Sequence, residues 1–137
     1  MRQRATMALV VTCVGVALVA NEKPPAAFQQ AMKDNGAMAQ KIGKDADAKD
    51  YAALAADAAA LKAAYSGPIT RYFTDAKHEA GLEKTKAAIT TVEALEKAAS
   101  AKDDAAVAEA RRAVTGGCQG CHAAHRERLP DGTFEIK

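Results

Sequence analysis

Cys118-Gln119-Gly120-Cys121-His122 is a C-x-x-C-H stretch close to the C-terminus of this 137-residue chain. Two thiols three positions apart can each add to one of the two vinyl groups of a haem, and a histidine directly after them can place an imidazole nitrogen on the iron. This spacing is typical of covalent haem attachment. We therefore interpret Cys118 and Cys121 as the attachment points of one haem c, and His122 as its proximal axial ligand.

Three other chemistries use the same residue types. A redox dithiol is expected beside a strand–helix unit, but no strand pattern precedes Cys118. A zinc site would have to draw Cys118, Cys121, His122 and His125 from about one helical turn and a half, whereas zinc sites usually combine ligand pairs from separate segments. A structural disulfide between the two cysteines leaves His122 without a role. Haem attachment is the interpretation that uses all three residue types.

The motif lies in the last of four predicted helices. Apolar and small side chains recur along this helix at three- and four-residue steps. Asp103 or Asp104 is its candidate N-cap, and its end is predicted near Leu129, ahead of Pro130-Asp131-Gly132.

Three more helices with apolar stripes precede it. They are predicted at residues 26–43, 51–65 and 82–99. Gly43 and Ser66-Gly67-Pro68 are read as the signals that end the first and the second. Residues 69–81 sustain no period and are predicted to form a structured loop.

Four helices with short connections and no β pattern predict an all-α fold, an antiparallel up-down-up-down four-helix bundle. In this topology the end of the fourth helix lies beside the start of the first. His122 is roughly 10 Å from that end and Met32 roughly 12 Å, so the two residues lie at nearly one level. Met32 is therefore the predicted distal ligand. Met38, roughly 9 Å further along, is expected to pack in the core.

Two alternatives to Met32 ligation stay open. A methionine on an apolar stripe is often core filling, and the distal side of the iron is then open or merely blocked. His78 is the rival ligand, because the loop between the second and third helices reaches the same end of the bundle. A histidine near a polar helix start is, however, more often a surface residue.

Arg126 follows His122 by one helical turn. Its guanidinium can lie near the imidazole or near a haem propionate, or it can be a solvated cation at the helix end. His125 and Arg128 share this turn and are expected to be exposed.

Residues 1–20 are predicted to be a secretory signal peptide. Arg2 and Arg4 give a basic start, an apolar run follows, and the expected cut is after Ala20. The run is short for a membrane span and lacks a basic flank, so an uncleaved anchor is the weaker alternative. Residues 21–137 then form one exported, periplasmic haem-binding domain without membrane contact.

Charge and cysteine content add little about partners. The chain has 19 basic and 17 acidic residues, and losing Arg2 and Arg4 with the signal balances them. No nucleic-acid partner is implied. Cys13 is expected to be removed with the signal, which leaves only the two motif cysteines.

The signal, the four-helix pattern and a C-x-x-C-H followed at the fourth residue by Arg126 resemble the class II cytochromes c, the group that contains cytochrome c prime. The segment 29–36 is similar to that of the low-spin, methionine-ligated subgroup, in which the methionine of Met-Lys-x-x-Gly is the sixth ligand. This resemblance implies Met32 and His122 as axial ligands. Phe28 stands where cytochrome c prime often has an arginine, and it joins Arg126 as a candidate haem-environment residue.

These features predict a single-electron carrier and not an enzyme. The main alternative is a five-coordinate protein that binds nitric oxide or carbon monoxide. A small peroxidase would need an acid–base residue on an open distal side, where His78 is the one candidate. The expected partners are redox proteins, and the resemblance leaves a homodimer through the first two helices open.

Overall fold

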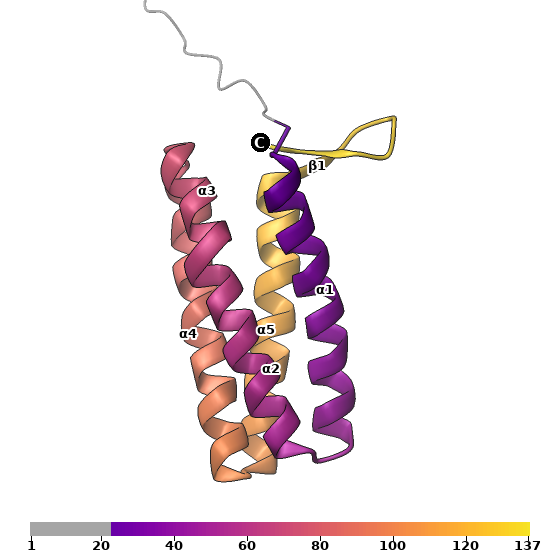
Figure 1. Cartoon of the computed structure of the whole chain (residues 1–137), viewed down its shortest axis with the longest axis vertical. Helices are drawn as coiled ribbons and strands as arrows, with labels where there is room; N and C mark the ends of the chain where they lie inside the picture. The colour runs from indigo at the N-terminus through magenta and orange to yellow at the C-terminus, as the bar shows by residue number, and fades with distance from the viewer. Residues whose placement is uncertain (1–22) are drawn as a thin grey trace, which may run out of the picture.

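The structure, a computed structural model, describes residues 23–137 as an antiparallel bundle of four helical segments (Figure 1). The predicted four-helix bundle is confirmed. The segments are α1 (Ala26–Asp47), then α2 (Tyr51–Ala64) continued by η1 (Tyr65–Ile69) and α3 (Thr70–Asp75), then α4 (Glu79–Ala101) and α5 (Asp104–His125). The predicted signal peptide, residues 1–20, lies outside the described residues.

The two ends of the bundle differ in which connections they hold. At one end α1 begins, α3 passes into α4 and α5 runs into the C-terminal segment; we call it the motif end. The other end, called the far end, holds the α1–α2 and α4–α5 turns (Figure 1). Within residues 23–137, no helix has both the length and the apolar character that crossing a membrane requires.

Apolar stripes from all four segments meet in one core. Its largest fully buried side chains are Ile42, Leu54, Leu61, Ile69, Val92 and Leu95. Burying an aliphatic side chain contributes about 1.5–3 kcal/mol, so these stripes hold the helices together. α4 packs on both α2 and α5, and α1 packs mainly on α2, whereas α1 and α5 meet more sparsely. Of the contacts between neighbouring helical segments, those between α1 and α5 are thus the sparsest, and Met32, Cys121 and His122 line a common space beside them.

The predicted end of the first helix at Gly43 was wrong. α1 continues to Asp47, because a glycine inside a helix costs only about 1 kcal/mol and packing outweighs it. The chain turns at Lys49, whose φ is 55°. Lys77 and Lys102 adopt the same left-handed conformation after the next two helical segments, at φ 53° and 55°. Glycine usually takes this position, so the sequence carries no clear sign of these turns.

The predicted stop at Ser66-Gly67-Pro68 and the loop at 69–81 were also wrong. The second segment stays helical to Asp75, because η1 widens to a π-helical turn around Pro68. A proline inside an α-helix lacks an N–H and clashes with the carbonyl one turn back, and the wider turn relieves this conflict. The Tyr65 carbonyl accepts from the Thr70 backbone N–H and also from the Thr70 hydroxyl, the latter at 2.7 Å.

Side-chain caps set the starts of the last two helical segments. Asp103 accepts a hydrogen bond from the Ala106 N–H, which confirms the N-cap predicted for α5. α4 begins at Glu79, earlier than predicted, because His78 Nδ1 accepts a hydrogen bond from the Gly81 N–H at 2.9 Å. Histidine is an unusual N-cap, and the sequence pattern did not indicate it.

The fourth helix ends at His125 and not near Leu129. A two-stranded antiparallel hairpin follows, in which β1 (Arg126–Arg128) pairs with β2 (Phe134–Ile136). The turn is closed by the Leu129 N–H, which donates to the Thr133 carbonyl at 2.8 Å, and Gly132 supplies the positive φ of 82°. The expectation of a chain without strands is therefore corrected at its last residues.

Candidate functional site

α5 carries the motif on a continuation of its inner face. Val107, Ala110 and Val114 are buried along this face. Cys118 and Cys121 follow at steps of four and three residues, which keep them on the same side of the helix. Both thiols are free and half-buried, so they lie inside the bundle yet remain reachable.

The Cys118 thiol faces Tyr65 in the π-helical turn. Cys118 Sγ and the Tyr65 hydroxyl oxygen lie 3.5 Å apart, within hydrogen-bonding distance for sulfur. Tyr65 is only 8% exposed, and burial, followed by the nearby Cys118, raises the pKa of its phenol. The phenol therefore stays protonated and remains a hydrogen-bond donor beside the sulfur.

Cys121 opens onto a cavity of about 340 Å³ between α1, α3, α5 and the hairpin. This space, the motif cavity, is lined mainly by Phe28, Met32, Gly36, Phe73, Cys121, His122, His125, Arg126, Phe134 and Ile136. Pockets for small molecules and cofactors span roughly 300–1,000 Å³ and are mostly apolar with a few placed polar groups. The motif cavity has this character.

His122 enters the motif cavity as a neutral imidazole. Burial lowers its pKa, and the positive charge of Arg126 lowers it further. An imidazole must be neutral to bind a metal ion through nitrogen, so both effects favour a ligand role. Burial raises the pKa of the Cys121 thiol, which keeps it protonated in the chain without a bound group.

Met32 lines the same cavity from α1, opposite the helix that carries His122. The structure thus brings together the two residues whose levels match in the predicted bundle. Met32 as an axial ligand stays a prediction, since shared lining is not coordination. Met38 packs against the core cluster.

Phe28 and Arg126 both reach the motif cavity, in different ways. Phe28 is 4% exposed, and its ring centroid lies 4.1 Å from that of Tyr72 and 5.6 Å from that of Phe73. Arg126 is exposed, and its guanidinium carbon lies 4.2 Å from the centre of the Phe134 ring. Phe28 is therefore a fixed wall, whereas Arg126 is held at the rim by the hairpin.

His78 is engaged elsewhere. Its Nδ1 accepts from Gly81, so the other ring nitrogen of the neutral ring carries the proton, and this Nε2 lies 3.3 Å from the Lys137 carbonyl oxygen. Neither nitrogen is free for iron, and His78 does not line the motif cavity. His125 was expected to be exposed, which is wrong: it is half-buried and lines the cavity. Arg128 is exposed, as expected.

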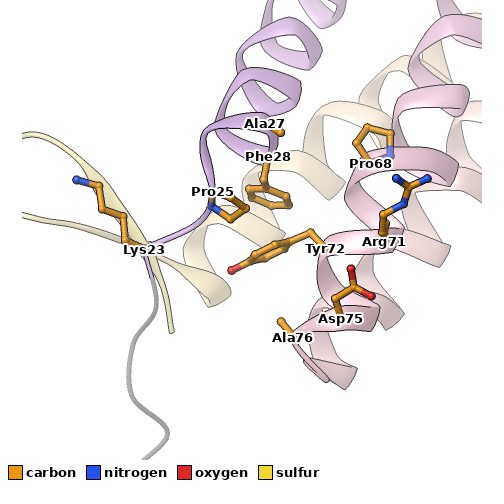
Figure 2. Close-up of a pocket in the computed structure, with 9 residues that line it drawn as sticks. All are labelled: Lys23, Pro25, Ala27, Phe28, Pro68, Arg71, Tyr72, Asp75 and Ala76. Atoms are coloured by element: carbon orange, nitrogen blue, oxygen red, sulfur yellow. The ribbon is translucent and has the colours of Figure 1, made fainter.

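A second pocket of about 570 Å³ lies on the other side of Phe28, between the start of α1 and α3 (Figure 2). In Figure 2 the Phe28 and Tyr72 rings lie next to each other, with Arg71 and Asp75 beyond them on α3. No cysteine, histidine or methionine lines this pocket. It offers no cysteine for attachment and neither histidine nor methionine for the iron, so we place the candidate site in the motif cavity.

The donor set of the motif cavity fits a haem. It combines a thiol for covalent attachment, a neutral imidazole and a thioether, and imidazole with thioether is an established axial pair. Among the residues that the structure describes, no three of His, Cys, Asp and Glu gather closely enough to hold a metal ion by themselves. Asn35, one turn after Met32, is 6% exposed. Neither its amide nitrogen nor its amide oxygen has a hydrogen-bond partner among residues 23–137. Asn35 does not line the motif cavity, so its unpaired amide lies beside the site and is not part of the donor set.

Comparison with known proteins bears on the fold. No protein-family model matches the chain, and no curated protein matches it. Among solved structures, it is similar to the crystal structure of cytochrome c′ from Rubrivivax gelatinosus, with a TM-score of 0.58 and 20% sequence identity. The match covers 74% of this chain and 95% of the other. At this identity the likeness shows the fold and assigns no residue.

Proposed function

We propose that this chain is a periplasmic electron-transfer protein of the class II cytochrome c type, with one haem c attached through Cys118 and Cys121. His122 is the proximal ligand and Met32 the distal ligand. The observation that carries the proposal is the motif cavity, because it joins Cys121, His122 and Met32 in one mostly apolar space. The similarity in fold to a cytochrome c′ supports it.

A bound haem supplies a one-electron couple, and the chain supplies its surroundings. The half-buried His122 offers a neutral nitrogen at neutral pH. Phe28 and Phe73 are 4% and 2% exposed, and both line the motif cavity, so this part of its wall is apolar. A thioether as second ligand raises the reduction potential, which suits a carrier that gives and takes electrons without chemistry on a substrate.

The role of Met32 separates this function from its alternative. A five-coordinate protein of the same fold would leave one side of the iron free for nitric oxide or carbon monoxide. We propose the carrier because Met32 lines the cavity shared with His122 and because both nitrogens of His78 are used elsewhere. Secretion by the predicted signal peptide, redox proteins as partners and a homodimer belong to this proposal as expectations.

The visible spectrum tests the proposal. We expect the purified ferric and ferrous protein to be low-spin, with sharp split bands on reduction and no response to carbon monoxide. Met32→Ala should keep the covalent haem and convert the iron to a high-spin form that binds carbon monoxide. Met38→Ala is the matched control and should leave the spectrum unchanged, since Met38 packs on the core. A high-spin wild-type spectrum that shifts with carbon monoxide would move the assignment to gas binding.

A further inference from the structure

The C-terminal hairpin contributes side chains to the motif cavity although it belongs to none of the four helices. Phe134 and Ile136, both from β2, line the cavity together with Met32 and His122. Ile136 also packs against the core cluster. Because β1 begins directly after α5, the helix that carries His122 also positions the hairpin.

Hydrogen bonds of Lys137 anchor the C-terminal end of the hairpin to the helices. The Lys137 N–H donates to the His125 carbonyl at 3.1 Å, which joins the end of the chain to the last turn of α5. His78 Nε2, which carries the proton, lies 3.3 Å from the Lys137 carbonyl oxygen and joins it to the start of α4. The Arg126 guanidinium lies over the Phe134 ring, an attractive cation–π arrangement. Two contacts therefore join the chain end after β2 to α5 and α4, and a third joins β2 to β1.

Strand pairing separates the two faces of the hairpin. Arg126 pairs with Ile136 and Glu127 with Glu135. Side chains alternate along a strand, and paired residues share a face, so Phe134 and Ile136 lie on the cavity side and Glu127 on the opposite side. Phe134 and Ile136 are half-buried. Apolar surface at a cavity rim is available to pack against a planar apolar ligand.

We propose that the hairpin is the outer wall of the haem pocket, in which Phe134 and Ile136 pack against the haem and shield its edge from water. This inference rests on the proposed function and deepens it. Water near the iron stabilises the more highly charged ferric state, so shielding raises the reduction potential. Phe134 and Ile136 are then positioning and shielding residues, not ligands.

The test compares side chains on the two faces of the hairpin in the haem-loaded protein. One variant combines Phe134→Ala with Ile136→Ala, a second carries Phe134→Leu, and the control is Glu127→Ala. A fourth variant ends at Leu129 and therefore lacks β2. It tests the shielding even if the substituted hairpin does not fold. The readouts are the midpoint potential and the broadening of haem proton signals by a neutral gadolinium chelate in solution.

We expect the double variant and the shortened chain to keep the covalent haem, to have a lower midpoint potential and to show stronger broadening of the haem signals. Phe134→Leu keeps an apolar side chain, so it should keep most of the shielding. Glu127→Ala should have the midpoint potential and the signal broadening of the wild type. A double variant and shortened chain that keep the wild-type potential and broadening would overturn the hairpin proposal alone. A wild-type protein without covalent haem would overturn the proposed function itself.

Discussion

The far end and the motif end of the bundle are stabilised in different ways. At the far end, Lys41 lies 2.7 Å from the carboxylate of Asp57, and Arg111 lies 2.6 Å from that of Asp47. The motif end instead holds the motif cavity, the π-helical turn and Asn35, whose buried amide has no partner among the described residues. The far end also holds one buried oxygen without a hydrogen bond within residues 23–137, Asp45 Oδ2, which lies 3.7 Å from Lys41 Nζ. Ion pairs therefore distinguish the far end, whereas the motif cavity distinguishes the motif end.

This difference indicates where a cofactor contributes stability. Apolar side chains that line a cavity gain free energy when a bound group packs against them. A group that binds only the folded chain adds to its stability, and most of that gain should appear where the space lies. We therefore expect haem to stabilise the motif end and to leave the far end nearly unchanged.

The double variant Cys118→Ser, Cys121→Ser should have the largest effect. It should lose covalently retained haem, because serine forms no thioether, and it should be less stable than the loaded protein by about 3 kcal/mol or more. Amide hydrogen exchange should accelerate in the first turns of α1 and the last turns of α5. Haem that still migrates with the variant on a denaturing gel would contradict the attachment site. Amide exchange that accelerates equally at both ends would contradict the expectation that haem stabilises mainly the motif end.

Leu54→Ala tests the far end. Leu54 is fully buried in the first turn of α2, and a leucine-to-alanine change in a core costs about 2–5 kcal/mol. Urea unfolding should show the same loss in the haem-loaded protein and in the double cysteine variant. A cost confined to the loaded protein would show that haem also governs the far end.

Asn35→Leu tests the motif end with a smaller change. Leucine has a similar shape without polar atoms, so it removes the cost of the unpaired amide. The double cysteine variant, which carries no covalent haem, should gain about 1–3 kcal/mol, measured by urea unfolding. The haem-loaded protein should gain as much, because Asn35 does not line the motif cavity. A smaller gain in the loaded protein would show that a bound group pairs with the Asn35 amide.

The smallest effect concerns Asp104 at the start of α5. Hydrogen bonds from Lys49 and Tyr51 lower the pKa of Asp104 below its usual 3.8. Its contribution to stability is therefore present above about pH 4 and is lost as the pH falls through the lowered folded-state value. Asp104→Asn should weaken the protein slightly at neutral pH and make no difference in strong acid, as measured by thermal unfolding. A stability difference between the wild type and Asp104→Asn that grows as the pH falls would contradict the lowered pKa of Asp104.

The same bond acts on Lys49 in the opposite direction. The hydrogen bond to Asp104 raises the pKa of Lys49 above 10.5, so its contribution is complete at neutral pH and is lost as the pH rises past the raised value. The Asp104→Asn difference should therefore also shrink in strong base.

The sequence predicts the bundle and the level of the site well, because both depend on apolar spacing and helix rise. The stripe through Val107, Ala110 and Val114 leads directly to the motif, and Met32 shares its cavity with His122. These inferences need only which side chains face inwards and how far each lies from a helix end.

The failures concern backbone details that packing decides. Glycine and proline were read as helix ends at Gly43 and Pro68, but the core holds both helices together across them. The true turn after α1 uses Lys49 in a left-handed conformation that lysine rarely adopts. The hairpin did carry a signal, since Asp131-Gly132 precedes a segment in which Phe134 and Ile136 alternate with polar residues. The helix stop was recognised there, and the strand was not.

The most direct test of the central claim is the mass of the mature protein and of its proteolytic peptides. We predict one haem per chain, retained under denaturing conditions and located on the peptide that contains Cys118 and Cys121. A mature chain with the mass of the unmodified polypeptide, or with a disulfide between these two cysteines, would contradict the account.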